Sequence, residues 1–495
     1  MATALDDRWR TLVRFGVYAT LVFSPLPFGS VQPWSMLGLE ILAALLGLGA
    51  VLVLARDREA LPRGAWLVLL PAFGLLAIGI VQLLPAPAWA ARWLTSPTAE
   101  AREAVARVLP EVATTAAPLS LSPPDTLDAV LRGISFGLVA LATAIAFRDR
   151  RHFKTIGFVI VVSATFQALY GAAEYLSQHQ HIFAYAKKYY LDCATGTFIN
   201  RNHFAAYLVM ALPLALGTLV DGWEAVFSSG SWRERLLRLA EPAYFSVIAA
   251  AVATFVIWIG VFLSYSRGGL AAALVATAVL GLQSVMSKRR MWVLVAACLL
   301  PTVFLAWQQM RTPGERFVTE ADQLASLNKR LPVWKVGASM IPPYATVGVG
   351  WGTFADAFQR YQPSSRLQWK HVHNDWLQTA IEGGVVAPLL VIWLLWLALT
   401  AAKRTSGRSP PIRKCLVAGI AALAFHCLLD FPLRIPAIGV LLACFVGLLC
   451  ARETYEADVR PLVRDPARRR PLRSRTQRPR HPQADASARF QVRPR

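Results

Sequence analysis

The chain has 495 residues, of which 55% are hydrophobic and only 16% are charged. This composition, together with several uninterrupted apolar runs of helix-spanning length, excludes a soluble globular protein and predicts a polytopic membrane protein. The net charge of +22 falls mostly in short connections and in the tail, so it does not indicate nucleic-acid binding.

Apolar segments of about 20 residues, the length that a membrane-spanning helix needs, recur along the whole chain. In chain order they are 11–28, 35–55, 65–85, 129–147, 155–174, 203–220, 243–264, 269–286, 291–307, 377–401, 414–430 and 436–451, which makes twelve. The first follows a basic N-terminus and lacks a convincing small-residue cleavage site, so we expect a retained helix. The fold class that follows is an all-α polytopic membrane protein with about twelve transmembrane helices.

The connections between these segments differ in charge. With a cytoplasmic N-terminus, every inner connection is basic, which supports this orientation and the even number of spans. The basic residues concerned are Arg56, Arg58, Arg63, Arg148, Arg150, Arg151, Lys154, Arg233, Arg235, Arg238, Lys288, Arg289, Arg290, Lys403, Arg404, Arg408, Arg413 and Lys414. Both termini are therefore expected in the cytoplasm.

Three of the outer connections in this topology are long. Residues 86–128 form a Pro- and Ala-rich loop, in which the stretch from Ala99 to Leu109 is a candidate interfacial helix. Residues 175–202 form the second of them. The large loop of about 308–376, between helices 9 and 10, is too long for a passive turn, and its aromatic residues argue against disorder.

The C-terminal tail differs from the membrane domain, residues 1–451. Residues 459–495 contain twelve arginines, two aspartates, many prolines and almost no large apolar residues, so they cannot form a core. We expect residues 452–495 to be a basic disordered cytoplasmic tail against anionic membrane lipids, with a docking arm for a partner protein as the alternative.

Reactive side chains gather at the end of the large loop, where residues 370–378 read Lys-His-Val-His-Asn-Asp-Trp-Leu-Gln. His371 and His373 alternate as in an extended segment, so both can point the same way, and Asn374 or Asp375 can cap the helix that follows. Asp375, Gln378 and Glu382 would then share one helical face. Histidines beside carboxylates suit proton transfer near neutral pH, because the free pKa of histidine is roughly 6.5.

Two other interpretations of this region are weaker. His371, His373 and Asp375 could bind a divalent ion, but two histidines without clear further ligands are poor zinc evidence, so we expect no metal. Residues 348–352, Gly-Val-Gly-Trp-Gly, lack the preceding strand and the following lysine of a nucleotide-binding loop. Glu382 near a helix start has a structural explanation as good as a catalytic one.

Positively charged residues on the outer side break the charge rule that the rest of the chain obeys. Arg201 and Arg267 fall at outer helix ends, and Arg330 falls in the large loop. Converging arginines near a bilayer would bind a membrane-anchored pyrophosphate bidentately, whereas a single one commonly only reaches to the interface. Between the last two segments, Asp430 and Arg434 can form a simple pair, and His426 lies one turn before Asp430.

Several of these motifs, in this order, resemble the O-antigen ligase and polysaccharide polymerase superfamily of bacterial inner-membrane proteins, over about residues 190–440. The resemblance is carried by residues 196–205 (Gly-Thr-Phe-Ile-Asn-Arg-Asn-His-Phe-Ala), Ser266-Arg267-Gly268, Arg330 with Trp334, Pro343 through Phe354, and residues 373–378 with Glu382-Gly383. It implies a metal-independent periplasmic glycosyltransferase without cofactors, in the broad GT-C fold class, whose donor is a saccharide linked to undecaprenyl pyrophosphate.

The resemblance also suggests roles for the residues. His373 matches the family's histidine and would act as base, with Asp375 or the helix start holding its imidazole in place and His371 beside it. Arg201, Arg267 and Arg330 would bind the pyrophosphate. Supporting residues would be Asn200, Asn202, Asn374, Gln378 and Glu382.

The choice among functions stays open at this stage. The long Pro-rich first outer loop and the stretch from Asp430 to Ala437 look more like polymerases of secreted polysaccharide, so the sequence favours a polymerase acting on a glycan acceptor. The alternatives are a ligase that transfers glycan to lipid A core or protein, a transporter or flippase for lipid-linked sugar, and a structural or scaffold protein. Proteins of polysaccharide assembly are candidate partners.

Overall fold

The computed structural model describes residues 2–61, 63–112, 116–227, 231–239, 241, 244–283, 330–362, 369–404 and 411–451. These residues are almost entirely helical, which confirms the all-α class. The predicted segment 291–307, the part of the large loop before residue 330, and the basic tail lie outside the described residues.

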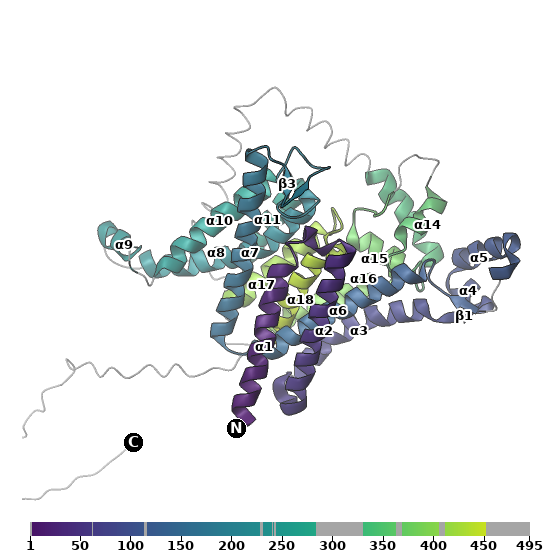
Figure 1. Cartoon of the computed structure of the whole chain (residues 1–495), viewed down its shortest axis with the longest axis horizontal. Helices are drawn as coiled ribbons and strands as arrows, with labels where there is room; N and C mark the ends of the chain where they lie inside the picture. Colours follow the sequence, from purple (N-terminus) through teal and green to yellow (C-terminus); the bar gives the residue numbers. More distant parts are fainter. Residues whose placement is uncertain are drawn as a thin grey trace, which may run out of the picture. The chain divides into compact units, whose positions relative to one another are not determined.

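Helices form most of the described chain, and Figure 1 labels them. They are α1 Ala2–Phe23, α2 Pro33–Arg56, α3 Arg63–Leu83, α4 Ala88–Leu94, α5 Ser96–Val108, α6 Pro123–Ala146, α7 Arg150–Leu176, α8 Arg201–Phe227, α9 Trp232–Leu239, α10 Phe245–Leu263, α11 Arg267–Leu282, α14 Phe354–Tyr361, α15 Asp375–Gly383, α16 Val386–Arg404, α17 Pro411–His426 and α18 Pro436–Cys450. Residues 330–340 are also helical, and short 3-10 turns occupy Phe28–Ser30, Arg58–Ala60, Pro110–Val112, Pro342–Tyr344 and Pro432–Arg434.

Two very short antiparallel hairpins complete the secondary structure. Strand β1 (Pro85–Pro87) pairs with β2 (Ala116–Pro118), and helices α4 and α5 lie in the segment between these two strands. Strand β3 (His181–Ile182) pairs with β4 (Tyr185–Ala186) in the connection that follows α7. The predicted interfacial helix within 99–109 is the greater part of α5.

Six described helices are long and apolar enough to cross a membrane, namely 33–56, 65–83, 123–146, 150–176, 201–223 and 245–263. Shorter apolar helices lie at 267–282, 386–397 and 436–450. Apart from 291–307, which lies outside the described residues, each of the twelve predicted segments contains helix. The number of helices that cross the membrane stays a prediction.

Helix α8 is the central element of the bundle, because 94% of its apolar 18-residue stretch is buried. It packs against α7, α10, α11 and α17. Small residues permit these close approaches: a Cβ on Gly419 of α17 would lie 2.7 Å from the carbonyl oxygen of Met210. Helix α18 is buried along its whole length and packs on α6.

The segment 377–401 differs from the expectation of one continuous helix. The chain breaks between α15 and α16 at Gly384, whose φ is +73°. This left-handed conformation suits glycine, and a side chain there would collide with the carbonyl oxygens of Ala345 and Thr346. The break makes α15 a separate short helix whose buried face can carry polar side chains.

Candidate active site

The segment that leads into α15 is held from both sides. Trp334 donates its indole N–H to the carbonyl of Val372 at 2.9 Å, and Val372 is fully buried. Asn374 caps α15 through its side-chain oxygen, which accepts from the backbone N–H of Leu377 at 3.0 Å. The predicted cap is therefore confirmed. The backbone N–H of Asp375 donates to the carbonyl of Cys427 at 2.8 Å, which fixes the start of α15 to the end of α17.

His373 has a left-handed backbone, with φ +56°. Its Nδ1 lies 3.1 Å from Oδ1 of Asp430, a carboxylate that is 1% exposed. Its ring meets Phe431 edge to face, with the centroids 4.9 Å apart. An ionised carboxylate can only accept hydrogen bonds, so Nδ1 of His373 carries a proton, and in the neutral form of the ring Nε2 has the lone pair.

Asp430 is the acceptor on which several donors converge. Asn202 donates its side-chain amide to Oδ2, the backbone N–H of Phe431 donates to Oδ1 at 2.9 Å, and Arg330 approaches Oδ2 at 3.5 Å. Arg330 also donates to the carbonyl of Leu429 at 2.7 Å. Burial alone would raise the pKa of Asp430, but the hydrogen bond with His373 and the charge of Arg330 outweigh it and hold the pKa well below its usual value.

A second polar cluster is built around Arg434. Its Nη1 donates to Oε2 of Glu382 at 2.5 Å, and its Nε lies 3.4 Å from Oδ1 of Asp375. Oδ2 of Asp375 accepts the backbone N–H of Leu433 at 2.9 Å, and Gln378 donates to Oε1 of Glu382 at 2.8 Å. Asp375, Gln378 and Glu382 are all buried, as expected for one shared helical face.

His371 connects the two clusters. Its Nδ1 lies 3.2 Å from the side-chain amide of Gln378, and its ring stacks on Phe431 with the centroids 4.1 Å apart. Phe431 therefore lies against both His371 and His373. Burial, reinforced by the charge of Arg434, lowers the pKa of His371 to about 3, which keeps this ring neutral. Burial also raises the pKa of Asp375 to about 6, although Arg434 opposes the change.

These contacts correct two expectations from the sequence. Asp375 does not hold the imidazole of His373, because its carboxylate is turned to Arg434 and Leu433. Asp430 and Arg434 do not pair with each other either: Asp430 contacts Arg330 and His373, whereas Arg434 contacts Asp375 and Glu382.

The glycine-rich stretch 348–352 packs against the C-terminal end of α15. Gly348, Gly350 and Gly352 all have positive φ, and the N–H of Gly350 donates to the carbonyl of Glu382 at 3.2 Å. A Cβ on Gly348 would lie 2.2 Å from that carbonyl oxygen, so only glycine fits. Gln82, at the end of α3, donates to the same carbonyl at 2.7 Å. The stretch is thus a turn that packs against the C-terminal end of α15.

The three predicted arginines occupy different environments. Arg201 begins α8, and its guanidinium lies over the ring of Tyr190 at 5.7 Å. Arg267 begins α11 and is exposed, with the start of the helix capped by Ser266. Arg330 is partly buried at Asp430, as described above. Arg201 and Arg330 both act electrostatically on Tyr190, so these two lie near the same ring.

The predicted supporting residues are also placed. Asn200 accepts the backbone N–H of Asn202 at 2.8 Å, so it shapes the start of α8, and Asn202 reaches Asp430 directly. The start of α11 lies close by, because a Cβ on Gly268 would lie 3.2 Å from Nε2 of His426, one turn before Asp430.

The sequence analysis missed Asp430, Phe431 and Arg434 as members of the site. A signal was present, because two charged residues in a short connection between apolar segments need partners. Gln82 gave no comparable signal, since it lies 300 residues from the Glu382 carbonyl that it binds.

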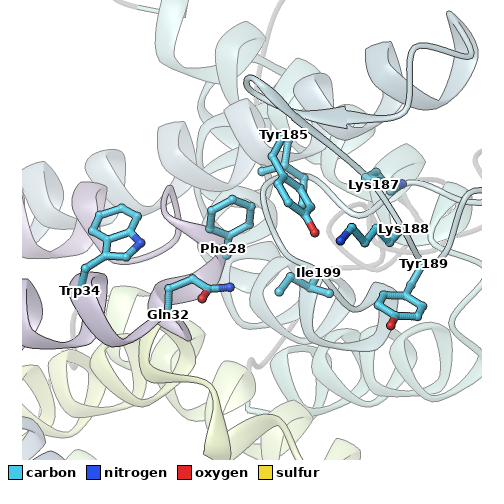
Figure 2. Close-up of a pocket in the computed structure, with 9 residues that line it drawn as sticks. Phe28, Gln32, Trp34, Tyr185, Lys187, Lys188, Tyr189 and Ile199 are labelled. Atoms are coloured by element: carbon cyan, nitrogen blue, oxygen red, sulfur yellow. The ribbon is translucent and has the colours of Figure 1, made fainter.

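A cavity of about 270 Å³ opens beside the connection that leads to Arg201. Figure 2 shows Phe28, Gln32 and Trp34 on one side of it and Tyr185, Lys187, Lys188 and Tyr189 on the other, with Ile182 and Ile199 completing the lining. Aromatic faces beside two ammonium groups suit sugars and anionic groups.

Comparison with known proteins supports the resemblance. Residues 252–394 match the family described as O-Antigen ligase, and no curated protein matches the chain. The matched segment includes Arg267, Arg330, His371, His373 and α15, and it excludes Arg201 and Asp430. The chain is therefore a multi-pass membrane protein with a segment of the O-antigen ligase type, which supports an enzymatic role.

Proposed function

Because residues 252–394 carry the O-antigen ligase match, we propose that the protein is a membrane glycosyltransferase that uses a lipid-linked saccharide donor. The donor would be a saccharide on undecaprenyl pyrophosphate, and the acceptor would be a glycan hydroxyl. The site would face the periplasm from a bacterial inner membrane, with both termini in the cytoplasm, as the basic inner connections predict.

The observation that carries this proposal is the contact of His373 with buried Asp430 at 3.1 Å. Since Nδ1 carries the proton, Nε2 is free to accept the proton of the attacking hydroxyl. General-base catalysis of this kind contributes roughly 10²- to 10⁴-fold in rate. Asp430 stabilises the imidazolium that forms, and Phe431 fixes the ring plane.

The departing pyrophosphate would be stabilised by the arginines. Arg267 is exposed at the first turn of α11, where backbone N–H groups also favour an anion. Arg201 is only partly buried, at the start of α8. Arg330 has part of its guanidinium committed to Asp430 and Leu429, so its main role would be to hold the ionised carboxylate that orients the base. The proposed reaction needs neither a metal nor another cofactor, since the arginines balance the charge of the leaving group.

A polymerase is favoured over a ligase on the sequence features of the first outer loop and of residues 430–437. In this chain the latter stretch supplies Asp430, Phe431 and Arg434 to the site, so a feature that looks like the polymerases is part of the candidate machinery. A ligase would use the same residues with lipid A core or protein as acceptor, and a flippase would bind the donor without consuming it.

Transfer by purified protein tests the proposal. Incubation with lipid-linked donor alone should give chain growth, which a ligase cannot produce without its acceptor and a flippase cannot produce at all. His373→Ala should lower turnover roughly 10²-fold or more. Because alanine in a left-handed conformation costs about 1 kcal/mol, His373→Asn is the better variant, since asparagine adopts that conformation readily.

Both variants should insert and fold normally, and cells that carry them should accumulate lipid-linked repeat units. His371→Ala should be milder if His371 only orients the site. Normal polymer from His373→Asn would refute the role of the base.

A further inference from the structure

We propose that the connection after α7 contains a divalent transition-metal site of the zinc type, formed by Glu174, His179 and His181. One ligand atom from each of the three side chains lies within 4.8 Å of the other two. This cluster is distinct from the His371 and His373 site, and the inference does not depend on the proposed function.

The hydrogen bonds of the histidines favour metal binding. Nδ1 of His181 lies 2.5 Å from the carbonyl oxygen of His179, and Nδ1 of His179 lies 2.9 Å from Oε2 of Glu174. The carbonyl of His179 has no proton to donate, so Nδ1 of His181 carries one and Nε2 of that ring would bind the ion. Metal-bound histidines generally donate their second ring N–H to a carbonyl or carboxylate, and His181 meets this condition here. Nδ1 of His179 and Oε2 of Glu174 already lie close to the spacing of two ligands on one ion, so these two atoms would bind it directly.

The position of Glu174 also favours a cation. Glu174 lies two residues before the end of α7, where the helix dipole disfavours negative charge. Its Oε2 lies 2.9 Å from Nδ1 of His179 and accepts the backbone N–H of His181 at 2.8 Å, which directs the carboxylate toward both histidines. A bound divalent ion would neutralise the carboxylate and the negative helix end together.

The backbone of this loop is strained in a way that presents the rings together. Gln178, Gln180 and Phe183 have φ of +60°, +57° and +53°, which is uncommon for residues other than glycine. Such strain often accompanies ligand clamps. The two imidazole rings stack with their centroids 3.9 Å apart.

The geometry requires only a small closure. Ligand atoms around a tetrahedral zinc lie roughly 3.3 Å apart, given zinc–nitrogen bonds of about 2.0–2.1 Å. Ligand atoms within 4.8 Å of one another reach that spacing by movements of about 1.5 Å or less. His179 is free to rotate because its side chain is 59% exposed. Water would complete the coordination.

Metal at this site would fix one wall of the cavity in Figure 2. The side-chain oxygen of Gln180, between the two histidines, accepts a hydrogen bond from the ammonium group of Lys187 at 2.9 Å. Lys187 in turn lines that cavity. Tyr170 on α7 accepts the N–H of Phe183 at 2.7 Å, so the helix holds the same hairpin one turn before Glu174. The metal would therefore join α7 to the cavity wall.

The test is zinc binding by the full-length protein, purified in mild detergent with a histidine-free tag and stripped with a chelator. Calorimetry with zinc should give one strong site per chain, and native mass spectrometry should show the same stoichiometry. His179→Ala with His181→Ala, and separately Glu174→Gln, should weaken binding at least tenfold. Zinc should also slow amide exchange at residues 178–190 in the parent and not in the double variant.

His152→Ala is the matched control, because His152 on α7 likewise faces a carboxylate, that of Asp149 at 3.4 Å, but at the other end of the helix. Unchanged binding in this control and lost binding in the other variants supports the site. The inference is wrong if the parent binds no zinc below roughly 100 µM, or if all variants bind alike. Because His179 is exposed and Glu174→Gln keeps the side-chain shape, misfolding cannot account for the loss in both variants, and far-ultraviolet circular dichroism checks it.

Discussion

Replacement of Asp430 by asparagine tests whether this carboxylate fixes the proton of His373. Four donors face Asp430: His373 Nδ1 and the Phe431 N–H at Oδ1, and Asn202 and Arg330 at Oδ2. An asparagine has one oxygen to accept these bonds, and its NH₂ group must face the other pair of donors.

The two orientations of that amide differ in cost. With NH₂ at the Oδ2 position, the charged Arg330 and Asn202 both lose an acceptor. With NH₂ at the Oδ1 position, only the Phe431 N–H is left unpaired, at about 1–3 kcal/mol, because the imidazole can change tautomer and accept from the amide. The second orientation is favoured, so the proton moves to Nε2 of His373 and the base is lost.

Asp430→Asn should therefore lower turnover roughly 10²- to 10⁴-fold, which corresponds to about 2.7–5.4 kcal/mol of transition-state stabilisation. The assay is consumption of lipid-linked donor by purified protein, with thermal unfolding measured in parallel. Asp375→Asn is the comparison, because it removes the acceptor of either Arg434 or Leu433 and leaves the His373 contact intact. It should lower thermal stability more than turnover.

The reasoning is refuted if Asp430→Asn keeps turnover within about threefold of the parent. It is also refuted if both variants lose stability and turnover in equal measure, because Asp430 would then be only a structural residue.

Two further predictions concern the arginines and pH. Arg267→Lys keeps the charge but loses the planar guanidinium that binds phosphate bidentately, so the variant should express normally and lose most transfer activity. If it makes glycan of wild-type length and yield, Arg267 does not bind the phosphate and its side chain only extends to the membrane interface. Burial lowers the pKa of His371 from 6.5 to about 3, so the folded protein binds fewer protons than the unfolded chain between these values and this ring removes stability as pH falls through the window. Burial of Asp375, which raises its pKa from 3.8 to about 6, acts in the opposite direction over a narrower range. The unfolding temperature should therefore decrease less between pH 7 and pH 5 in His371→Asn than in the parent. An equal decrease in both proteins would contradict a neutral, buried His371 ring.

Hydrophobic runs located the helices because a helix in lipid must be apolar along nearly its whole length. The same signal hid the break at Gly384, since Gly383-Gly384 lies inside a continuous apolar run and glycine is tolerated in membrane helices. Only the contact with residues 345 and 346 shows why a bend is required there. A local pattern cannot report a collision with a segment about 40 residues away.

Contacts between neighbours in sequence were predictable, whereas contacts that depend on packing were not. Asn374 was identified as a cap because capping needs only the three residues that follow. The group that holds His373 was expected to be Asp375 or the start of the helix, whereas the observed partner, Asp430, lies 57 residues further along the chain. Distance in sequence is a poor guide when a connection between two buried helices folds back over the site.

The left-handed backbone of His373 explains why the nearer carboxylate is not the partner. At φ +56° the chain turns before α15, and the side chains of His373 and Asp375 enter different clusters, the first at Asp430 and the second at Leu433 and Arg434. Strained residues of this kind persist where the surroundings fix them, and here the Asn374 cap, the Trp334 bond to Val372 and the Asp375 bond to Cys427 do so. The same strain separates a carboxylate paired with a histidine from carboxylates paired with an arginine, so the base and the buried ion pair beside it can be tested by separate substitutions.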